Sequence, residues 1–336
     1  MGVDEIMATC PLKHEIRVNL WVPYIKKLNK TPISYLTLYS PPLMDVKYLE
    51  HCKLIEEKDG VYKQVVGVGI DAEGEANTVS QLDKRLELLL SGNINNLING
   101  TIKTAKVKQL EDKFPFDVIN LDYTDTLHRQ GLNTQISPHI LAISNIFEKQ
   151  KKGKVDQFVL FLTAFVAPQH YNQGFIDYLK ELIDINIRET PNFGSKLERL
   201  FNCNNSNDYY NNHTNECFAV ALTKVVLHNM HDYHFTLEEG EIKWLIRDEN
   251  MPERRMLHLA FYIKEFIPPP ITKRANIGQR KNDVKNKSVQ FLKASYHTLR
   301  ETEDRERLNR KHQKQITEFN RLTFELNVPT PKTNNE

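Results

Sequence analysis

The sequence predicts an α/β protein with a mostly parallel, doubly wound sheet, and three observations support this class. Short apolar runs alternate with helical segments along the chain, which is typical of parallel strands joined by crossover helices. Two of the runs pass directly from apolar residues to an acid, at Asp71 and Asp122. Two later apolar runs, 241–247 and 256–266, are joined by turn-forming residues and predict an antiparallel hairpin at the end of the sheet.

The first half of this pattern begins after an entry segment of about 32 residues with a helix-like stretch at 21–28. The expected elements are, in order, a strand over 35–39, a helix over 43–54, a strand over 65–71, a helix over 77–91 and a turn over 93–100. Ser40-Pro41-Pro42 ends the first strand, because proline cannot donate to a strand ladder. Leucines at helical spacing after the cap residues Asn77-Thr78 predict the helix at 77–91.

The second half continues the alternation and then changes character. The expected elements are a strand ending at Asp122, a helix over 136–150, a strand over 158–165, a helix over 172–187, an Asn-rich loop over 202–215, a helix over 217–230 and the two hairpin strands. The strand at 158–165 is almost wholly apolar, which is typical of a strand buried on both faces. A chain of 336 residues has room for one large α/β domain with an appendage, or for two modest domains.

Three consecutive prolines, Pro268, Pro269 and Pro270, divide the chain into a body and an arm. We therefore expect an entry segment over 1–32, a Rossmann-like domain over 33–267, and a Pro-rich spacer with a helical arm over 268–336. Residues 271–336 carry 15 Lys and Arg against 8 Asp and Glu, a net charge of +7, whereas the rest of the chain has a net charge of −5.

The basic arm, residues 271–336, has two interpretations. Its positive charge would neutralise phosphates, a source of affinity that does not depend on base sequence, so nucleic acid is one expected partner. The alternative is a helix whose charged face is simply solvated. The last apolar residues at helical spacing, Ile316, Phe319, Thr323 and Leu326, also suit a contact between this C-terminal helix and a protein partner.

Composition narrows the class of protein and its location. Of the 336 residues, 40% are apolar and 26% are charged, as in folded globular proteins. No apolar run reaches the ~20 residues that span a bilayer, so we expect no membrane association. The four cysteines form no Cys-x-x-Cys pair, and the N-terminal residues do not resemble a signal peptide, so a reducing cytoplasm is the expected location.

Several common catalytic motifs are missing from the sequence. It contains no Gly-x-x-x-x-Gly-Lys-Ser/Thr loop and no Gly-x-Ser-x-Gly elbow, which disfavours a P-loop NTPase and a serine hydrolase. His228, His231 and His234, with Cys203, His213 and Cys217 upstream, suggest a zinc site at first sight. Their spacings match no compact zinc motif, so no metal is expected and these histidines are better read as capping or exposed residues.

The segment around Asp122 carries the strongest functional signal. Val118-Ile119-Asn120-Leu121 is apolar enough for a buried strand, and it delivers Asp122 to the carboxyl edge of the sheet, where open α/β sheets bind ligands. The alternative is an ordinary core strand that ends on a solvated acid. The following Tyr123 could stack on a nucleic-acid base or be a half-buried core residue.

The order of these strand ends resembles a known family. A parallel sheet with Asp71 after its second strand, Asp122 after its fourth, and a final antiparallel hairpin is similar to the class I, Rossmann-like S-adenosylmethionine-dependent methyltransferases. In that family an acid after the second strand binds the ribose hydroxyls of the cofactor. The resemblance assigns this role to Asp71, with Glu73 as a nearby substitute.

The same resemblance places the methyl-transfer end of the site at Asp122, Tyr123 and Asp125. Val-Ile-Asn-Leu-Asp-Tyr is similar to the Asp-Val-Ile-Asp-Leu-Asp-Pro-Tyr motif of tRNA guanine-N2 methyltransferases, although Asp122-Tyr123-Thr124-Asp125 replaces Asp-Pro-Tyr. Asp122 or Asp125 would accept a hydrogen bond from an exocyclic amine, and Tyr123 would stack on the base. The chain also resembles proteins found near bacterial DNA-modification or defence proteins.

One turn departs from the family. The family's first strand runs into a Gly-rich turn, whereas this chain has Tyr39-Ser40-Pro41-Pro42-Leu43-Met44-Asp45, and two prolines remove two N–H donors there. The resemblance therefore implies cofactor contacts from Tyr39, Ser40 and Asp45 in place of glycine amides. Two functions remain open: a methyltransferase acting on nucleic acid, or an inactive methyltransferase-like scaffold that binds nucleic acid or partner subunits.

Overall fold

A computed structural model of the chain describes most of the body and little of the arm. The described residues are 11–39, 43–69, 84–126, 137–166, 171, 173–189, 192–201, 210, 212, 214–246, 255–266 and 298–300. The chain divides into two compact units, Met1–Asn93 with Arg300–Glu336, and Ile94–Leu299. The three-part organisation with boundaries after 32 and 267 stays a prediction.

The first unit builds a small sheet around its longest strand. Its elements are α2 (Pro11–Ile16), η1 (Arg17–Trp21), α3 (Val22–Lys26), β1 (Tyr35–Leu38), α4 (Met44–His51), β2 (Glu57–Lys58), β3 (Val61–Gly69) and β4 (Leu86–Ser91). β3 pairs in parallel with β1 and with β4, and its first residues pair antiparallel with the short β2. β1, α4 and β3 thus form a β-α-β unit with the expected strand order.

The helix expected over 77–91 is wrong where the structure describes this segment, because residues 86–91 form strand β4. Leu86 and Leu90 are buried while Glu87 between them is exposed, and Leu86 lies opposite Tyr62 in the parallel ladder. A run of leucines suits either element, and pairing with β3 decides between them. Residues 77–83 lie outside the described part of the chain.

The second unit holds the longer strands. Its elements are α6 (Ile94–Asn99), α7 (Ala105–Glu111), β5 (Val118–Thr126), α8 (Pro138–Lys152), β6 (Gln157–Val166), α9 (Gln173–Glu189), α10 (Phe193–Phe201), α12 (Thr214–Asp232), β7 (Phe235–Ile246) and β8 (Arg255–Glu265), with the short β9 (Thr298–Arg300) at the unit boundary. β5 and β6 are parallel, whereas β8 pairs antiparallel with both β6 and β7. The order within this unit is β5-β6-β8-β7.

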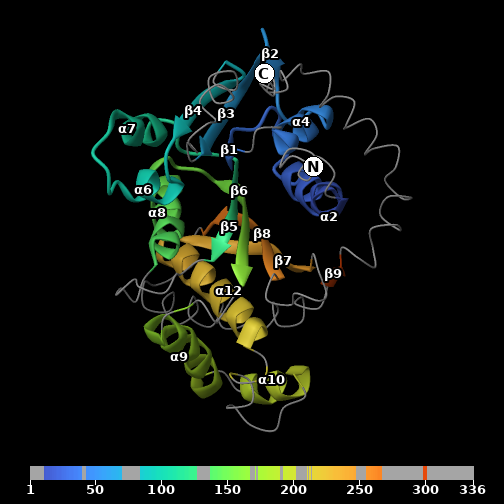
Figure 1. Cartoon of the computed structure of the whole chain (residues 1–336), viewed down its shortest axis with the longest axis vertical. Helices are drawn as coiled ribbons and strands as arrows, with labels where there is room; N and C mark the ends of the chain where they lie inside the picture. Colours follow the sequence, from blue (N-terminus) through green and yellow to red (C-terminus); the bar gives the residue numbers. More distant parts are fainter. Residues whose placement is uncertain are drawn as a thin grey trace, which may run out of the picture. The chain divides into compact units, whose positions relative to one another are not determined.

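Helices α8 and α12 pack on one face of this sheet (Figure 1). Phe147 of α8 contacts Phe158 of β6 and Phe235 of β7, with ring centroids 5.9 and 6.1 Å apart. All three rings are fully buried. Aromatic edge-to-face packing of this kind adds to the free energy gained by burying apolar area.

Two other expected elements differ from the structure. Residues 94–99 form helix α6 rather than a turn. Ile94, Leu97 and Ile98 form one buried apolar face, and burial of this face outweighs the preference of the intervening asparagines for turns. In the arm, for which a helix was expected, Thr298–Arg300 is a strand. The described helices include none long and apolar enough to cross a membrane.

Parallel and antiparallel strands with covering helices confirm the expected α/β class. β1 and β6 closely match the predicted strands, whereas β3 begins earlier, at Val61, and β5 continues beyond Asp122 to Thr126. The connection between β7 and β8, residues 247–254, lies outside the described residues.

Candidate functional site

The carboxyl edge of the first unit carries two of the predicted cofactor residues, Tyr39 and Asp45. Asp45 lies in the first turn of α4 and is buried. Its Oδ2 accepts hydrogen bonds from Tyr35 Oη at 2.7 Å and from Thr37 Oγ1 at 2.8 Å. These bonds tie α4 to β1, so the carboxylate of Asp45 already serves the packing of the unit.

Tyr39 lies against the end of β3 in a way that explains a glycine there. Its backbone N–H donates to Val68 O at 3.0 Å. A Cβ added to Gly69 would lie 1.7 Å from Tyr39 Cε1, so the ring occupies the space that a side chain at position 69 would fill. Gly69 is therefore needed for the close approach of Tyr39.

Leu43, at the start of α4, adopts an unusual backbone conformation. It has φ 48° and ψ 39°, in the left-handed region, and its side chain is 1% exposed. This region disfavours side chains other than glycine by roughly 1–2 kcal/mol, and burial of the leucine side chain offsets this cost.

Ser40, Asp71 and Glu73, the other predicted cofactor contacts, lie outside the described residues, and their roles stay predictions.

Asp122 lies on β5, opposite Thr163 of β6 in the parallel ladder. Thr163 in turn lies opposite His258 of β8, and His258 lies opposite Lys243 of β7. Residues opposite each other in neighbouring strands project from the same face of a sheet. Four polar residues therefore form one row across the sheet of the second unit, and we call Asp122, Thr163, His258 and Lys243 the polar row.

The centre of the polar row is almost fully buried. Thr163 is 2% exposed and His258 is 1% exposed, and Thr163 Oγ1 lies 2.7 Å from His258 Nδ1. The tautomer of the imidazole decides which of the two donates. The His258 ring also stacks on Phe161, with centroids 6.2 Å apart. Burial and these contacts fix the imidazole in one orientation.

The ends of the polar row are more open. Asp122 is half-buried, and Lys243 Nζ pairs with Glu241 Oε1 at 2.5 Å on the same strand. The row thus runs from a carboxylate in the middle of β5, through a hydroxyl and an imidazole, to an ion pair. Because β5 continues beyond Asp122 to Thr126, the expectation that Asp122 ends its strand is wrong. Asp122 can accept a hydrogen bond, while Thr163 and His258 provide neighbouring groups that can donate or accept a proton.

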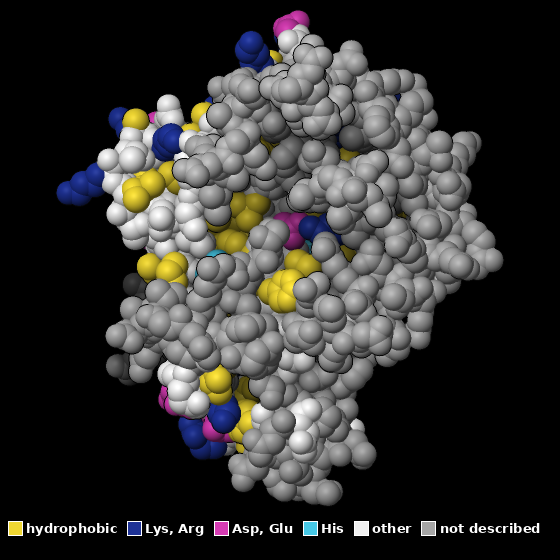
Figure 2. Space-filling view, viewed as in Figure 1, with side chains coloured by type: hydrophobic (Ala, Val, Ile, Leu, Met, Phe, Trp, Pro, Cys, Tyr) yellow, Lys and Arg dark blue, Asp and Glu magenta, His cyan; other side chains and the backbone are white. Residues whose placement is uncertain are grey.

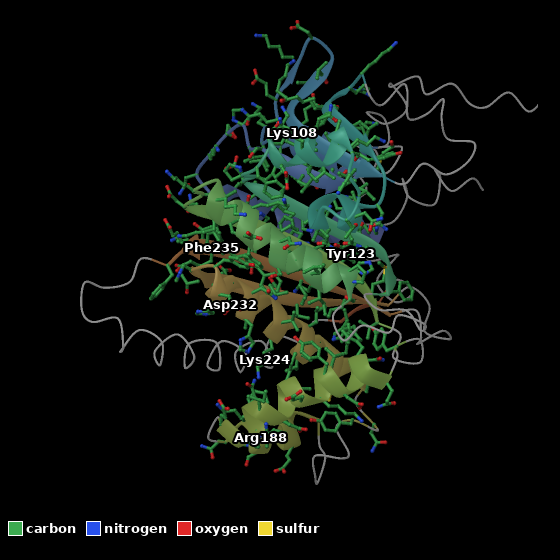
Figure 3. The ribbon with its side chains drawn as sticks, turned by 90° about the vertical axis from the view of Figure 1, so that its left-hand side faces the viewer. Lys108, Tyr123, Arg188, Lys224, Asp232 and Phe235 are labelled. Atoms are coloured by element: carbon green, nitrogen blue, oxygen red, sulfur yellow. The ribbon has the colours of Figure 1, made fainter. Side chains whose placement is uncertain are left out.

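Tyr123 points to the opposite face from the polar row and is 4% exposed. Its Oη donates to Asn95 Oδ1 of α6 at 2.8 Å, and its ring packs edge-on against His139 of α8 at 4.6 Å. Figure 3 shows Tyr123 near the helices that cover this face. Burial raises the pKa of the phenol well above its usual range. The arrangement favours the core interpretation of Tyr123; the side chain of Asp125 lies outside the described residues.

Sequence reasoning missed Thr163 and His258. Each interrupts an apolar run, Phe-Leu-Thr-Ala-Phe in β6 and Met-Leu-His-Leu-Ala in β8. A single polar residue inside a buried strand needs a partner, and that need was the available signal. Only the register of the strands shows that the two residues are partners of each other.

No group of three His, Cys, Asp or Glu residues that could hold a metal occurs among the described residues. Cys217, His228 and His231 lie on α12, spread over much of its length, and His234 follows it. Cys203 and His213 belong to the parts of the chain that are not described.

Parallel strands with a crossover helix, in the order β4-β3-β1 in one unit and β5-β6 in the other, define an α/β protein of the Rossmann-like class with polar groups at its carboxyl edges. The chain belongs to the PP_RS20740-like family, whose model matches residues 10–325.

Comparison with solved structures finds similarity to a protein in the NADB-Rossmann superfamily from Streptococcus agalactiae. The two sequences are 10% identical, the match covers 80% of this chain and 94% of the other, and the TM-score is 0.29. Superposition at that level is too loose to carry an argument about this chain. No significant match was found among curated proteins.

Proposed function

We propose that the chain is a methyltransferase-like protein that acts on or with nucleic acid, with S-adenosylmethionine as its candidate cofactor. One observation carries the proposal: β8 is antiparallel and lies between β6 and β7. A dinucleotide-binding sheet of the doubly wound type continues in parallel beyond its fifth strand, whereas the methyltransferases that the sequence resembles finish in an antiparallel hairpin.

The acceptor end of the proposed site is at Asp122. Methyl transfer needs the acceptor nitrogen held in line with the methyl group, so positioning supplies much of the rate. In this proposal Asp122, and Asp125 three residues later, accept hydrogen bonds from an exocyclic amine. Tyr123, anchored to Asn95 and His139, holds the end of β5 on which these carboxylates stand.

The described residues fit the cofactor only in part. The resemblance implies that Asp71 or Glu73 would hold the ribose, with Tyr39, Ser40 and Asp45 nearby. Asp45 is occupied by two hydrogen bonds within the unit, and the gap at Gly69 is filled by the Tyr39 ring. When bound, the cofactor would supply an activated methyl group, and the chain itself supplies binding and orientation.

These same two contacts favour a second candidate function. The space at Gly69 is filled by the ring of Tyr39, and Asp45 accepts two hydrogen bonds inside the protein. Both features suit a methyltransferase-like scaffold without catalysis. Such a module would bind nucleic acid or partner subunits, in keeping with the resemblance to proteins near bacterial DNA-modification and defence proteins. Fold alone does not choose between these functions, because activity depends on the site.

Calorimetric titration of the full chain with S-adenosylmethionine tests the choice. The enzyme proposal expects micromolar binding that Asp71→Ala weakens at least tenfold, while Asp112→Ala, an exposed acid at the end of α7, leaves it unchanged. Absence of heat from a folded wild-type protein contradicts the enzyme proposal and favours the scaffold.

The proposed nucleic-acid contact comes from the basic arm, 271–336. On the face shown in Figure 2, the described Lys and Arg side chains lie in small separate groups, whereas residues 271–336 carry a net charge of +7, so the arm is the better candidate. A gel-shift assay over a range of salt tests this with the full-length chain. The variant replaces four arm residues by Gln, namely Lys273, Arg274, Arg280 and Lys281.

Each lost phosphate contact lowers the slope of log affinity against log salt by about 0.9 on duplex DNA, so the variant should bind more weakly and with a flatter salt dependence. A matched control replaces four exposed lysines of the body by Gln, namely Lys58, Lys103, Lys108 and Lys196. Equal affinity of the arm variant and wild type would refute the role of the arm. A protein partner at the C-terminal helix remains an independent part of the proposal.

A further inference from the structure

A cavity of about 250 Å³ lies in the second unit, beside helices α9 and α12. Its walls are mostly apolar and aromatic, and they include Ile176, Leu179 and Ile183 from one side of α9 and Phe218 from α12. None of these residues belongs to the polar row or to the predicted cofactor contacts. The cavity is therefore separate from the candidate site described above.

The aromatic wall of the cavity is held rigidly. Tyr171 stacks on Phe218, with ring centroids 5.1 Å apart and an interplanar angle of 26°. It also packs edge-on against Phe175 at 5.4 Å. Tyr171 Oη donates to Phe165 O at 3.4 Å, which ties the wall to the end of β6. A ring entering the cavity would meet a preformed surface, so little ordering would oppose its binding.

A cation borders the same cavity. Lys180 is half-buried, and its Nζ lies 5.2 Å from the ring centroid of Tyr210, which also lines the cavity. Within the described part of the chain, Lys180 has no carboxylate partner at ion-pair distance.

The nearby acids have other partners. Tyr210 Oη donates to Asp184 Oδ1 at 2.5 Å, and Gln173 Nε2 donates to Asp177 Oδ1 at 2.7 Å. Each carboxylate accepts a hydrogen bond from a neutral donor, and neither forms an ion pair with Lys180 among the described residues. The ammonium of Lys180 lies at the edge of the cavity.

We propose that this cavity binds a small aromatic carboxylate. A cavity of about 150 Å³ holds benzene, so 250 Å³ accommodates a bicyclic ring with a short acidic side chain. The ring packs against Tyr171 and Phe218, and the carboxylate pairs with Lys180, where partial burial strengthens the attraction. The proposal does not depend on the methyltransferase-like function.

The test uses indole-3-acetate as the probe and the full-length chain. Calorimetric titration should give binding in the micromolar to low millimolar range. Indole-3-acetamide, which has the same ring without the charge, should bind at least tenfold more weakly. Lys180→Met, which keeps the length of the side chain but removes its charge, should reduce the affinity for the acetate to that for the acetamide.

Two further variants make the result specific. Lys196→Met removes an exposed lysine of α10 and should bind like wild type, while Tyr171→Leu should lose binding of both probes. Circular dichroism and a thermal melt check that each variant is folded. Cys217 is buried and lines the cavity, so indole-3-acetate should also slow its alkylation by N-ethylmaleimide in wild type.

Three results would each overturn the proposal: no binding of indole-3-acetate to the folded wild type at millimolar concentration, equal binding of the acetate and the amide, or wild-type affinity in a folded Lys180→Met. A fourth result would also count against it: if N-ethylmaleimide alkylates Cys217 equally fast with and without bound indole-3-acetate, the probe binds elsewhere and this cavity is not its site.

Discussion

Gly69 and Tyr39 show how single residues shape the carboxyl edge of the first unit. The ring of Tyr39 fills the space at Gly69, and Asp45 holds α4 to β1 through Tyr35 and Thr37. Tyr39 and Asp45 were expected from the sequence to contact a cofactor. The structure gives both of them packing roles, which no local pattern indicates because each depends on a partner from another element.

Replacing Gly69 by Ala should destabilise the protein by about 1–3 kcal/mol, because the added Cβ would lie 1.7 Å from Tyr39 Cε1 and the ring must move. In a Tyr39→Ala background the same change should cost much less. Urea denaturation of the two single variants and the double variant measures this coupling.

Gly194→Ala is a matched control, since its Cβ would meet only Ile187 Cγ2 at 3.5 Å, and it should be neutral or slightly stabilising. A Gly69→Ala variant as stable as wild type would show that Tyr39 does not occupy this space.

Lys47 should make stability depend on pH. Burial, with help from the nearby Arg85, lowers its pKa from 10.5 to about 8, although Glu50 opposes the shift. Between pH 8 and 10.5 the unfolded chain binds more protons at this residue than the folded chain does, so its contribution to stability rises with pH. Below pH 8 the cost of a buried charge is present in full.

Lys47→Met should therefore raise the free energy of unfolding by about 1–3 kcal/mol at pH 7, and the gain should disappear near pH 10.5. Thermal unfolding of variant and wild type at pH 7 and pH 10 measures the difference. Lys58→Met, at an exposed position of β2, should have little effect at either pH. A gain that grows with pH would contradict the assignment.

The polar row shows what sequence can and cannot reveal about a site. Asp122 was predicted at the end of β5 because an apolar run ends there. Thr163 and His258 were missed, since their partnership requires that β6 and β8 be antiparallel neighbours in one particular register. Tyr123 was left open between base stacking and the core, and its contacts with Asn95 and His139 favour the core.

At the scale of elements, long runs with one clear pattern were predictable and short or ambiguous ones were not. α8, β6 and α9 lie close to their expected ranges because their apolar residues repeat over several turns or fill a whole strand. β4 was mistaken for a helix, because leucines suit both elements and the partner strand decides. α6 was mistaken for a turn, because its asparagines are typical of turns, although Ile94, Leu97 and Ile98 between them are buried.

The start of α8 offers a direct test at this scale. Ser137 is fully buried, and its Oγ accepts a hydrogen bond from the backbone N–H of Ile140 at 3.2 Å. Ser137→Ala should cost about 1 kcal/mol of stability, because an amide of the first turn loses its acceptor. Thr104→Ala is the matched control, since Thr104 caps α7 without a side-chain hydrogen bond. Equal effects of the two variants in urea denaturation would show that Ser137 is no effective cap.

Figure 3 also shows Lys224 between α12 and α9. Its Nζ donates to Leu182 O at 2.5 Å, and the side chain is 2% exposed. Lys224 is a single charged residue within the apolar run Cys-Phe-Ala-Val-Ala-Leu-Thr-Lys-Val-Val-Leu of α12, but the sequence does not show which group accepts its hydrogen bond. The bond pins the two helices whose side chains border the cavity.

At the scale of the whole molecule, alternating strands and helices predicted the α/β class, and the family model matches residues 10–325, which include most of the predicted arm. Two domains were one of the two arrangements expected from the length of the chain, but the boundary of the two compact units after Asn93 was not predicted, because contacts rather than composition define it. The central claim is that the chain binds a nucleoside cofactor through the segments that the sequence resemblance assigns to it.

Hydrogen–deuterium exchange of the full-length chain, with and without S-adenosylhomocysteine, tests that claim most directly. Bound S-adenosylhomocysteine should slow exchange in peptides that cover residues 38–45, 69–75 and 120–126, and it should leave exchange in peptides from α10 unchanged. Unchanged exchange at all three segments with saturating ligand, or protection confined to other parts of the chain, would contradict it.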